Sequence, residues 1–534
     1  MPDASVGLRH DASAARATSG GTVLLRWAPL AAWIAACLCV ALPILGHAFV
    51  PMVDLPAHMA RQFVMSDSQG ALDRFYEYRF SFVPNAAVDM LRALIPIGDI
   101  FAFTRAVTAA YAVLFVSSVM VLARVLWGRW VAWPAASALL VFNGVFFWGF
   151  QNFLVTVPVA VFGFALWIAI EARPAWQRAL AFVPVAAVVM LMHLYAFLGL
   201  ALMAGGYEIQ RVIEAPRGER GAQMRRCLIL ALPFVLMCGV ELVDILTAPA
   251  NPNGGKTSWG EVMMRFLLPV RMLASPFEIH WPRLWQSTVM VIVAFAAFLI
   301  ATLNGLRPAA RFGIRIDRRI AGPALALFVA SLAVPYLLGG VYYSDMRFPI
   351  FFAMLLFAGS RWHGVGPGAG AVIATLIAAV VVMRSMAYDD LARHYDADLR
   401  DLGRIAGALP PGAKVLAVSD AVETSGDPMF WHLDAYLVPM AKVYVPSLFL
   451  GVHNFRVRSE WAEMSAPQTG LYYQKSLIAP GQTPSRFDET YVQDWDRKYD
   501  YVVMIGPGQE PLAAPDRLVP TAVSGRFSLY RVTP

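Results

Sequence analysis

The sequence predicts an α-helical polytopic membrane protein of about 11 transmembrane helices, followed by a small C-terminal extracytoplasmic α/β domain. Of its 534 residues, 58% are hydrophobic and only 15% are charged, whereas about a quarter of the residues of an ordinary soluble domain carry charge. The net charge is +11 up to residue 386 and −4 after it. This basic excess fits phospholipid headgroups and cytoplasmic loops better than nucleic acid.

The apolar stretches define the membrane part, because a transmembrane helix needs about 20 apolar residues. The first stretch is too long for a signal peptide and lacks a convincing cleavage site, so we expect it to be retained. Residues 346–361 are short, and residues 177–212 fit either one long helix or two tight ones. The clear candidates are 24–50, 101–123, 131–150, 152–171, 227–248, 285–304, 321–341 and 369–386.

Orientation decides between one helix and two in residues 177–212. Four connections are rich in arginine, namely 124–129, 172–178, 211–226 and 307–319. If all four are cytoplasmic, the chain crosses twice between 178 and 211, with a hairpin tip near His193. The same logic makes 131–171 a hairpin with its tip at Gln151 and Asn152.

The domain organisation follows from this count of eleven spans. Residues 1–23 form a cytoplasmic tail, and residues 24–386 form the membrane domain with outer loops 51–100 and 249–284. Residues 387–534 form the extracytoplasmic domain. Its segments 413–420 ("AKVLAVSD"), 501–508 ("YVVMIGPG") and 527–532 ("FSLYRV") have the pattern of short strands, and 388–408 has helical spacing that stops at "LPPG".

Several functional classes lack support in this sequence. The four cysteines lie in or beside apolar stretches, so they indicate neither a disulfide framework nor a cysteine metal cluster. The chain has no Walker A, GxSxG or HExxH motif, and its nine histidines are scattered. Hydrolase, ATPase and zincin functions are therefore disfavoured.

The segment "MVDLPAHMARQFVM" follows the first apolar stretch and carries Asp54, His58 and Arg61. At 100° per residue, a helix places these three side chains within an arc of about 60°. They would then form one polar face beside the outer membrane surface. Alternatively, Asp54 caps an interfacial helix and the two basic residues reach lipid phosphates.

Further polar residues fall at the same outer face under this topology. Most polar residues at such positions are turn formers or interfacial belt residues, but their number at one depth suggests a polar pocket roofed by the C-terminal domain. Lys256 belongs to outer loop 249–284, which fits either an anion site or an amphipathic segment on the membrane. The other candidate substrate contacts are Gln151, Asn152, His193, Tyr195, Asp345 and Arg347.

These motifs resemble the GT-C glycosyltransferases of bacterial inner membranes. The resemblance lies in "VDLPAHMARQF", "GFQNF", "HLYAF" and "DMRF", and in an acid after the first span, about ten further spans and a C-terminal outer domain. It implies inverting transfer of a sugar from a polyprenyl-phosphate donor to a glycan, lipid or protein acceptor at the outer face.

The resemblance also implies roles for individual residues. Asp54 would be the general base, and His58 or His193 would orient the acid or the phosphate. Arg347, Arg61 or Lys256 would stabilise the departing lipid phosphate. Many members carry a second acid in the first loop, where this chain has Leu55 beside Asp54. Asp89, Asp99 and Asp345 are candidates for that acid, and a divalent cation is left open as a cofactor.

Two rival functions are a flippase or transporter for lipid-linked sugars and a non-catalytic envelope assembly protein. Against a transporter, the sequence has no paired Gly/Pro-broken helices in matching halves and little charge at the membrane midplane. Replacing Asp54 with Asn separates the readings, because only an enzyme should lose turnover while still binding the lipid.

Overall fold

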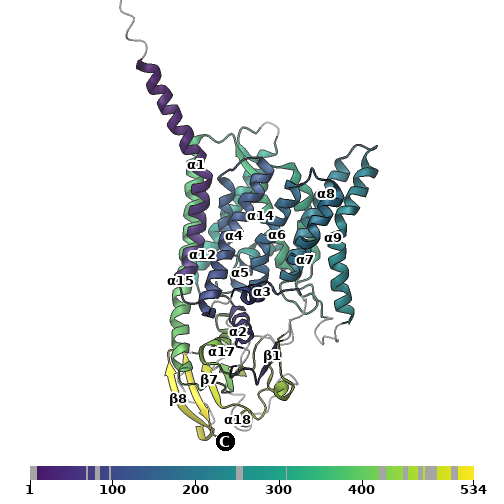
Figure 1. Ribbon diagram of the computed structural model, residues 1–534. Coiled ribbons are helices and arrows are strands. Elements are labelled where there is room, and N and C mark those ends of the chain that lie inside the picture. Colours follow the sequence, from purple (N-terminus) through teal and green to yellow (C-terminus); the bar gives the residue numbers. More distant parts are fainter. Residues whose placement is uncertain are drawn as a thin grey trace, which may run out of the picture.

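The computed structural model shows long helices bundled side by side, with the C-terminal domain at one end of the bundle (Figure 1). Seven helices of the described chain are long and apolar enough to cross a membrane. They are α1 (Arg9–Leu45), α4 (Ile100–Trp127), α6 (Gln151–Ala169), α7 (Ala175–Met192), α9 (Arg220–Thr247), α12 (Pro282–Gly305) and α15 (Pro367–Ala406). The structure describes residues 9–67, 70–78, 84–95, 98–247, 256–307, 310–419, 428–448, 455–466, 473–474, 490–506 and 515–533. A mostly helical chain with several helices compatible with membrane spans is therefore confirmed, and the count of eleven spans stays a prediction.

Shorter elements complete the bundle. The predicted break at His193 is confirmed, because α7 ends at Met192 and α8 (Leu194–Glu214) begins after it. Residues 131–150 differ from the continuous helix that the sequence predicts, since they form the 3₁₀ helix η1 (Trp133–Leu140) and the short α5 (Gly144–Trp148). Asn143 causes the interruption: its side chain accepts a hydrogen bond from Phe146 N at 3.0 Å and so starts a new helix. Helices α13 (Ala321–Ala333) and α14 (Arg347–Gly359) have 13 residues each.

The arginine-rich connections meet at the end of the bundle opposite the C-terminal domain, which we call the arginine-rich end. Arg226 donates to the carbonyl of Glu171 at 2.7 Å, and Arg318 pairs with Glu214 at 2.9 Å. Arg319 donates to the carbonyl of Leu126. These contacts link the connections 124–129, 211–226 and 307–319 to one another and to Glu171, the residue before the fourth connection. The other end of the bundle is called the tail end below.

The C-terminal domain contains a mixed five-stranded sheet of order β6-β4-β7-β9-β8. The predicted strands are confirmed as β4 (Val415–Ser419), β7 (Tyr501–Ile505) and β9 (Phe527–Val532). Strands β4 and β7 are parallel, whereas β9 is antiparallel to β7 and to β8. The two strands that sequence reasoning missed lie at the sheet edges, β6 (Tyr473–Gln474) and β8 (Leu518–Ser524).

Helix α15 joins the two parts of the molecule without interruption. The predicted domain boundary at residue 387 lies inside this 40-residue helix, which ends at Ala406, close to the predicted stop. Beyond residue 387 the helix first packs on the bundle, where the Tyr388 ring stacks on Phe142 at 4.4 Å between centroids, and then reaches the C-terminal domain, where Tyr395 contacts Tyr436. The predicted N-terminal tail is partly helical as well, since α1 begins at Arg9.

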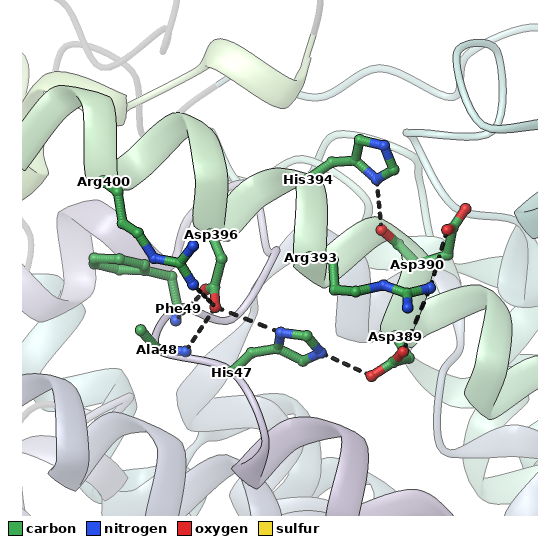
Figure 2. A network of polar contacts seen from close by, with 9 residues as sticks. All are labelled: His47, Ala48, Phe49, Asp389, Asp390, Arg393, His394, Asp396 and Arg400. Atoms are coloured by element: carbon green, nitrogen blue, oxygen red, sulfur yellow. Dashed lines mark hydrogen bonds and ion pairs between the residues drawn. The ribbon is translucent and has the colours of Figure 1, made fainter. Parts of the chain in front are cut away.

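A polar network holds the chain leaving α1 against α15 (Figure 2). The Asp396 carboxylate accepts hydrogen bonds from the backbone N–H groups of Ala48 and Phe49, at 3.0 and 2.9 Å. His47 contacts Asp389 through Nε2 at 2.8 Å and Asp396 through Nδ1 at 3.4 Å. Because this network fixes residues 47–49, it also fixes the start of the connection that leads to Asp54.

The remaining elements surround the tail end or form local connections. A two-stranded ladder of β1 (Tyr76–Tyr78) and β5 (Phe455–Val457) ties the connection between α1 and α4 to the C-terminal domain, and β2 (Gly313–Ile316) pairs with β3 (Ser360–His363) at the arginine-rich end. The short helices are α2 (Leu55–Ser66), α3 (Ala87–Leu94), α10 (Val262–Phe266), α11 (Leu268–Leu273), η2 (Arg318–Ile320), η3 (Ser344–Met346), η4 (Pro428–Phe430), η5 (Leu433–Tyr436), α17 (Leu437–Ala441), η6 (Ser459–Met464), α18 (Trp495–Lys498) and η9 (Pro515–Arg517).

Candidate functional site

Asp54 lies at the N-cap position of α2 and is positioned by the α5–α6 turn. Its backbone N–H donates to the carbonyl of Trp148 at 3.1 Å, and Val53 N donates to Phe147 O at 2.9 Å. Gly149 has φ +81°, and a Cβ there would lie 2.8 Å from Asp54 N. The Asp54 side chain makes no capping hydrogen bond to α2. Its carboxylate is therefore not occupied by the capping role that the sequence leaves open.

The carboxylate of Asp54 instead faces His432, which comes from the C-terminal domain. The Asp54 Oδ1 to His432 Nε2 distance is 3.7 Å, and the two side chains are 22% and 3% exposed. Burial raises the pKa of Asp54 to about 7, an effect that the positive charge of Arg347 opposes. Burial lowers the pKa of His432 to about 4, partly offset by a hydrogen bond with the Ser447 backbone. The imidazole is thus neutral at pH 7, where Asp54 gains and loses its proton.

Arg347 is the buried cation of this site, with a side chain at the start of α14 that is 5% exposed. Its guanidinium lies over the rings of Phe150 and Tyr195, at 4.5 and 4.7 Å from their centroids, and over Phe153 at 5.5 Å. Its Nη1 lies 3.2 Å from His193 Nε2. Within the described chain, Arg347 Nε has no hydrogen-bond partner and no carboxylate lies within ion-pair distance of the guanidinium. A buried cation of this kind favours an anionic ligand.

Neighbouring residues hold this arrangement in place. Asp345 adjoins Arg347 in the sequence, but its carboxylate pairs with Arg271 at 2.7 Å. The hydroxyl of Tyr195 donates to Ser344 Oγ at 2.7 Å, which fixes the ring beneath the guanidinium. Asp345 is therefore neutralised by its own partner, and the charge of Arg347 is left to act on Asp54.

Aromatic rings line the boundary between the bundle and the C-terminal domain here. Trp148 lies 4.3 Å from Tyr343 and 6.0 Å from Trp431, between ring centroids. Tyr343 also lies 6.2 Å from Phe150 and adopts a left-handed backbone with φ +56°. Non-glycine residues seldom adopt this conformation, and they cluster at ligand sites.

Three of the predicted site residues brace the helices around this cluster, and a fourth is buried beside them. Arg61 forms an ion pair with Asp89 at 2.9 Å, and both side chains are almost fully buried. Gln62 Nε2 donates to Gln151 Oε1 at 3.1 Å. Asn152 accepts from Val88 N at 2.8 Å and donates to Asn85 O at 2.6 Å. His58 is buried one turn after Asp54 in α2. A phosphate contact by Arg61 would require its pair with Asp89 to open.

The remaining predictions fall further from Asp54. The Lys256 side chain is exposed, and its carbonyl accepts from Gly340 N at 3.2 Å. All three candidates for a second acid are engaged elsewhere, since Asp89 binds Arg61, Asp345 binds Arg271 and Asp99 caps α4 through Phe101 N. In the described part of the chain, no three His, Cys, Asp or Glu side chains converge as a metal site.

Sequence reasoning missed His432 and Trp431, which the C-terminal domain adds to the cluster. The stretch "MFWHLD" has neither the periodicity nor the spacing of a motif, so no local signal marked it. A roof over the site was expected from the topology, but not which residues would form it. Cavities of about 690 and 910 Å³ lie elsewhere, one beside β7 and β9 in the C-terminal domain and one at the arginine-rich end.

Comparison with known proteins adds no family assignment. No protein-family model matches the chain, and no curated protein matches it significantly. The function of the chain has to be inferred from its own residues.

Proposed function

We propose that this protein is an integral membrane glycosyltransferase of GT-C type, which transfers a sugar from a polyprenyl-phosphate donor to an envelope acceptor at the outer membrane face. One observation carries the proposal. A carboxylate with a pKa of about 7, Asp54, lies in the field of a buried guanidinium, Arg347, that has no carboxylate partner of its own in the described chain. The reaction requires a base for the acceptor hydroxyl and a binding site for the departing phosphate, and these two residues would supply them.

Asp54 acts as the general base. It takes the proton from an acceptor hydroxyl as the hydroxyl oxygen forms a bond to the anomeric carbon of the sugar. A base is most effective when its pKa lies near the working pH, as the pKa of Asp54 does. The bond from the anomeric carbon to the phosphate oxygen breaks on the opposite side, so the sugar is transferred with inversion.

Arg347 binds the departing lipid phosphate. Negative charge grows on the phosphate as the bond breaks, and a preorganised cation in a dry site stabilises that charge strongly. The guanidinium is held by aromatic faces and His193, which leaves N–H groups for phosphate oxygens. Tyr195 and His193 hold the guanidinium in this orientation.

His432 positions Asp54 from the side of the C-terminal domain. A protonated imidazole at 3.7 Å would hold the carboxylate ionised and weaken it as a base, whereas burial keeps this imidazole neutral. The neighbouring Trp431, Trp148 and Tyr343 offer an aromatic surface of the kind that lines small-molecule sites.

The membrane setting supports the same conclusion. Arginine-rich connections favour the cytoplasmic side, which puts the tail end, with Asp54, at the outer face of a bacterial inner membrane. A lipid phosphate donor reaches this face within the bilayer, and no nucleotide or nucleotide-binding loop is needed. Envelope glycans, lipids and proteins are the acceptors available there.

The test uses the full-length protein in nanodiscs, with radiolabelled polyprenyl-phosphate sugars and an envelope fraction from a strain lacking the protein. Asp54→Asn should lower the transfer rate by about 10²- to 10⁴-fold while the lipid still binds. Asp99→Asn is the matched control, because Asp99 caps α4 away from the cluster and Asn also caps well. Equal transfer by Asp54→Asn and the wild type would point to a flippase or an assembly protein instead.

A further inference from the structure

A cavity lies at the arginine-rich end, at the opposite end of the bundle from Asp54. There a cavity of about 910 Å³ separates α12 from the start of α15 and is closed on one side by β3. This volume is within the range of roughly 300 to 1,000 Å³ that is usual for small-molecule sites. Its lining includes Ala297, Ile300 and Leu303 of α12, Arg307 just after that helix, and Trp362 of β3.

The cavity is apolar along its length and basic at its rim. Ile300 and Leu303 are 68% and 65% exposed on a helix long and apolar enough to cross a membrane, so this wall faces lipid. Arg307 lies where α12 gives way to the connection 307–319 and is exposed. An apolar channel that ends at a cation matches an acyl chain that ends at a phosphate.

The indole of Trp362 supplies a further, independent observation. Three tryptophans lie close together here, and two of their N–H groups are satisfied: Trp133 Nε1 donates to Ser360 Oγ at 2.7 Å, and Trp127 Nε1 donates to Ala358 O at 3.0 Å. Trp362 Nε1 is buried and has no hydrogen-bond partner in the described chain. A buried donor without a partner is costly, and because the Trp362 ring lines the cavity, a small rotation of the ring would offer this N–H to the ester carbonyl of a bound lipid.

We propose that this cavity binds one anionic phospholipid, with an acyl chain between α12 and α15, an ester carbonyl accepting from Trp362 and the phosphate against Arg307. Basic pockets between transmembrane helices at the cytoplasmic side bind such headgroups. The small residues Gly366 and Ala369 keep the α15 wall open, since the space around a Cβ at Gly366 is empty to 4 Å. The site is independent of the proposed glycosyl transfer, because it shares no residue with the Asp54 cluster.

The experiment is native mass spectrometry of the full-length protein released from nanodiscs of equal phosphatidylglycerol and phosphatidylcholine. The wild type should retain one phosphatidylglycerol. Ala297→Trp, which fills the cavity from α12, should retain none. Ala296→Trp is its control, because Ala296 is exposed on the same helix and does not line the cavity.

Two milder variants test the polar contacts and guard against misfolding. Arg307→Gln should lower the preference for phosphatidylglycerol over phosphatidylcholine about fivefold, whereas Arg311→Gln, on an exposed arginine outside the cavity, should not. Trp362→Phe should weaken retention of both lipids. A wild type that retains no lipid, or retains both lipids equally, would overturn the proposal, as would retention by Ala297→Trp.

Discussion

Two buried arginines near the tail end of the bundle differ in how their donors are used. Arg384 in α15 is 2% exposed, and its guanidinium donates to the carbonyls of Phe142, Leu273 and Leu284 and to the hydroxyls of Ser287 and Thr288. Arg347 in α14 is 5% exposed, yet in the described chain only His193 lies within hydrogen-bonding distance of its guanidinium.

The contrast separates a cation whose donors are used within the protein from one that has donors left for a ligand. A buried guanidinium with its N–H groups satisfied fastens the segments that supply the acceptors. A buried guanidinium held mainly by ring faces keeps donors available, at a cost to stability that only a ligand removes. The two arginines are almost equally buried, so burial does not distinguish them. The number of hydrogen-bond partners of each guanidinium in the described chain does.

The largest expected effect is on transfer by Arg347→Gln. We expect the rate to fall about 10²- to 10³-fold, because the departing phosphate loses its cation. The melting temperature should change little, since the variant removes a poorly satisfied buried charge. Initial rates and thermal melts of the same nanodisc sample measure both. Wholesale loss of folding in this variant would place Arg347 with Arg384 as a structural residue.

The reverse outcome is expected for Arg384→Gln. This change leaves several buried acceptors without donors, so unfolding should become easier by on the order of 3 to 5 kcal/mol. Denaturant titration in detergent measures the loss. The protein that remains folded should transfer sugar at the wild-type rate, and a slow but fully stable variant would contradict the comparison.

Protonation of Asp54 should make the stability of the folded protein depend on pH. Its pKa is about 7 in the folded protein against an ordinary 3.8, so the folded state binds more protons between these values and wild-type stability falls as the pH rises through that window. Asp54→Asn should therefore be more stable than the wild type above pH 7, by on the order of 4 kcal/mol, and equal to it below pH 4. His432 has the opposite slope, but both proteins carry it.

Protonation of Asp54 should also make the rate of sugar transfer depend on pH. Only ionised Asp54 accepts a proton, so the wild-type rate should rise with pH up to about 7 and level off above it. Melting curves and initial rates across pH 4 to 9 test both halves of this prediction. A rate independent of pH across this range would remove Asp54 from the role of base.

The smallest effect is expected from Gly149→Ala. The new Cβ would lie 2.8 Å from Asp54 N in a left-handed backbone, which should cost about 1 to 3 kcal/mol and displace the carboxylate. Gly128→Ala is the control, because its φ is +68° but its Cβ would meet nothing within 4 Å. Loss of transfer with Gly149→Ala alone would show that the α5–α6 turn positions Asp54.

Local patterns in the sequence predicted the helix break at His193, three of the strands and the sharing of one end by Asp54 and Arg347. Which acid or aromatic ring each arginine contacts could not be predicted from local patterns. Arg61 and Arg347 are the same residue type at similar depth, and only the fold gives Asp89 to Arg61 and aromatic rings to Arg347.

His432 and the domain boundary escaped prediction for different physical reasons. His432 reaches Asp54 across 378 positions of sequence through the packing of two domains, which leaves no short-range signal. The sequence predicts the domain boundary near residue 386, where the last apolar stretch ends. The backbone hydrogen bonds of α15 continue past that point. They form within the helix, so they do not depend on whether its side chains contact lipid or protein.

The continuity of α15 has a mechanical consequence. At 1.5 Å per residue, its 40 residues make a rod about 60 Å long. Ala369 and Ile373 near one end line the cavity at the arginine-rich end, and the far half is held through Asp389 and Asp396 and packs against β8 and β9. Because the helix is continuous between these ends, a tilt at the arginine-rich end would also move the part of the C-terminal domain that packs against its far half.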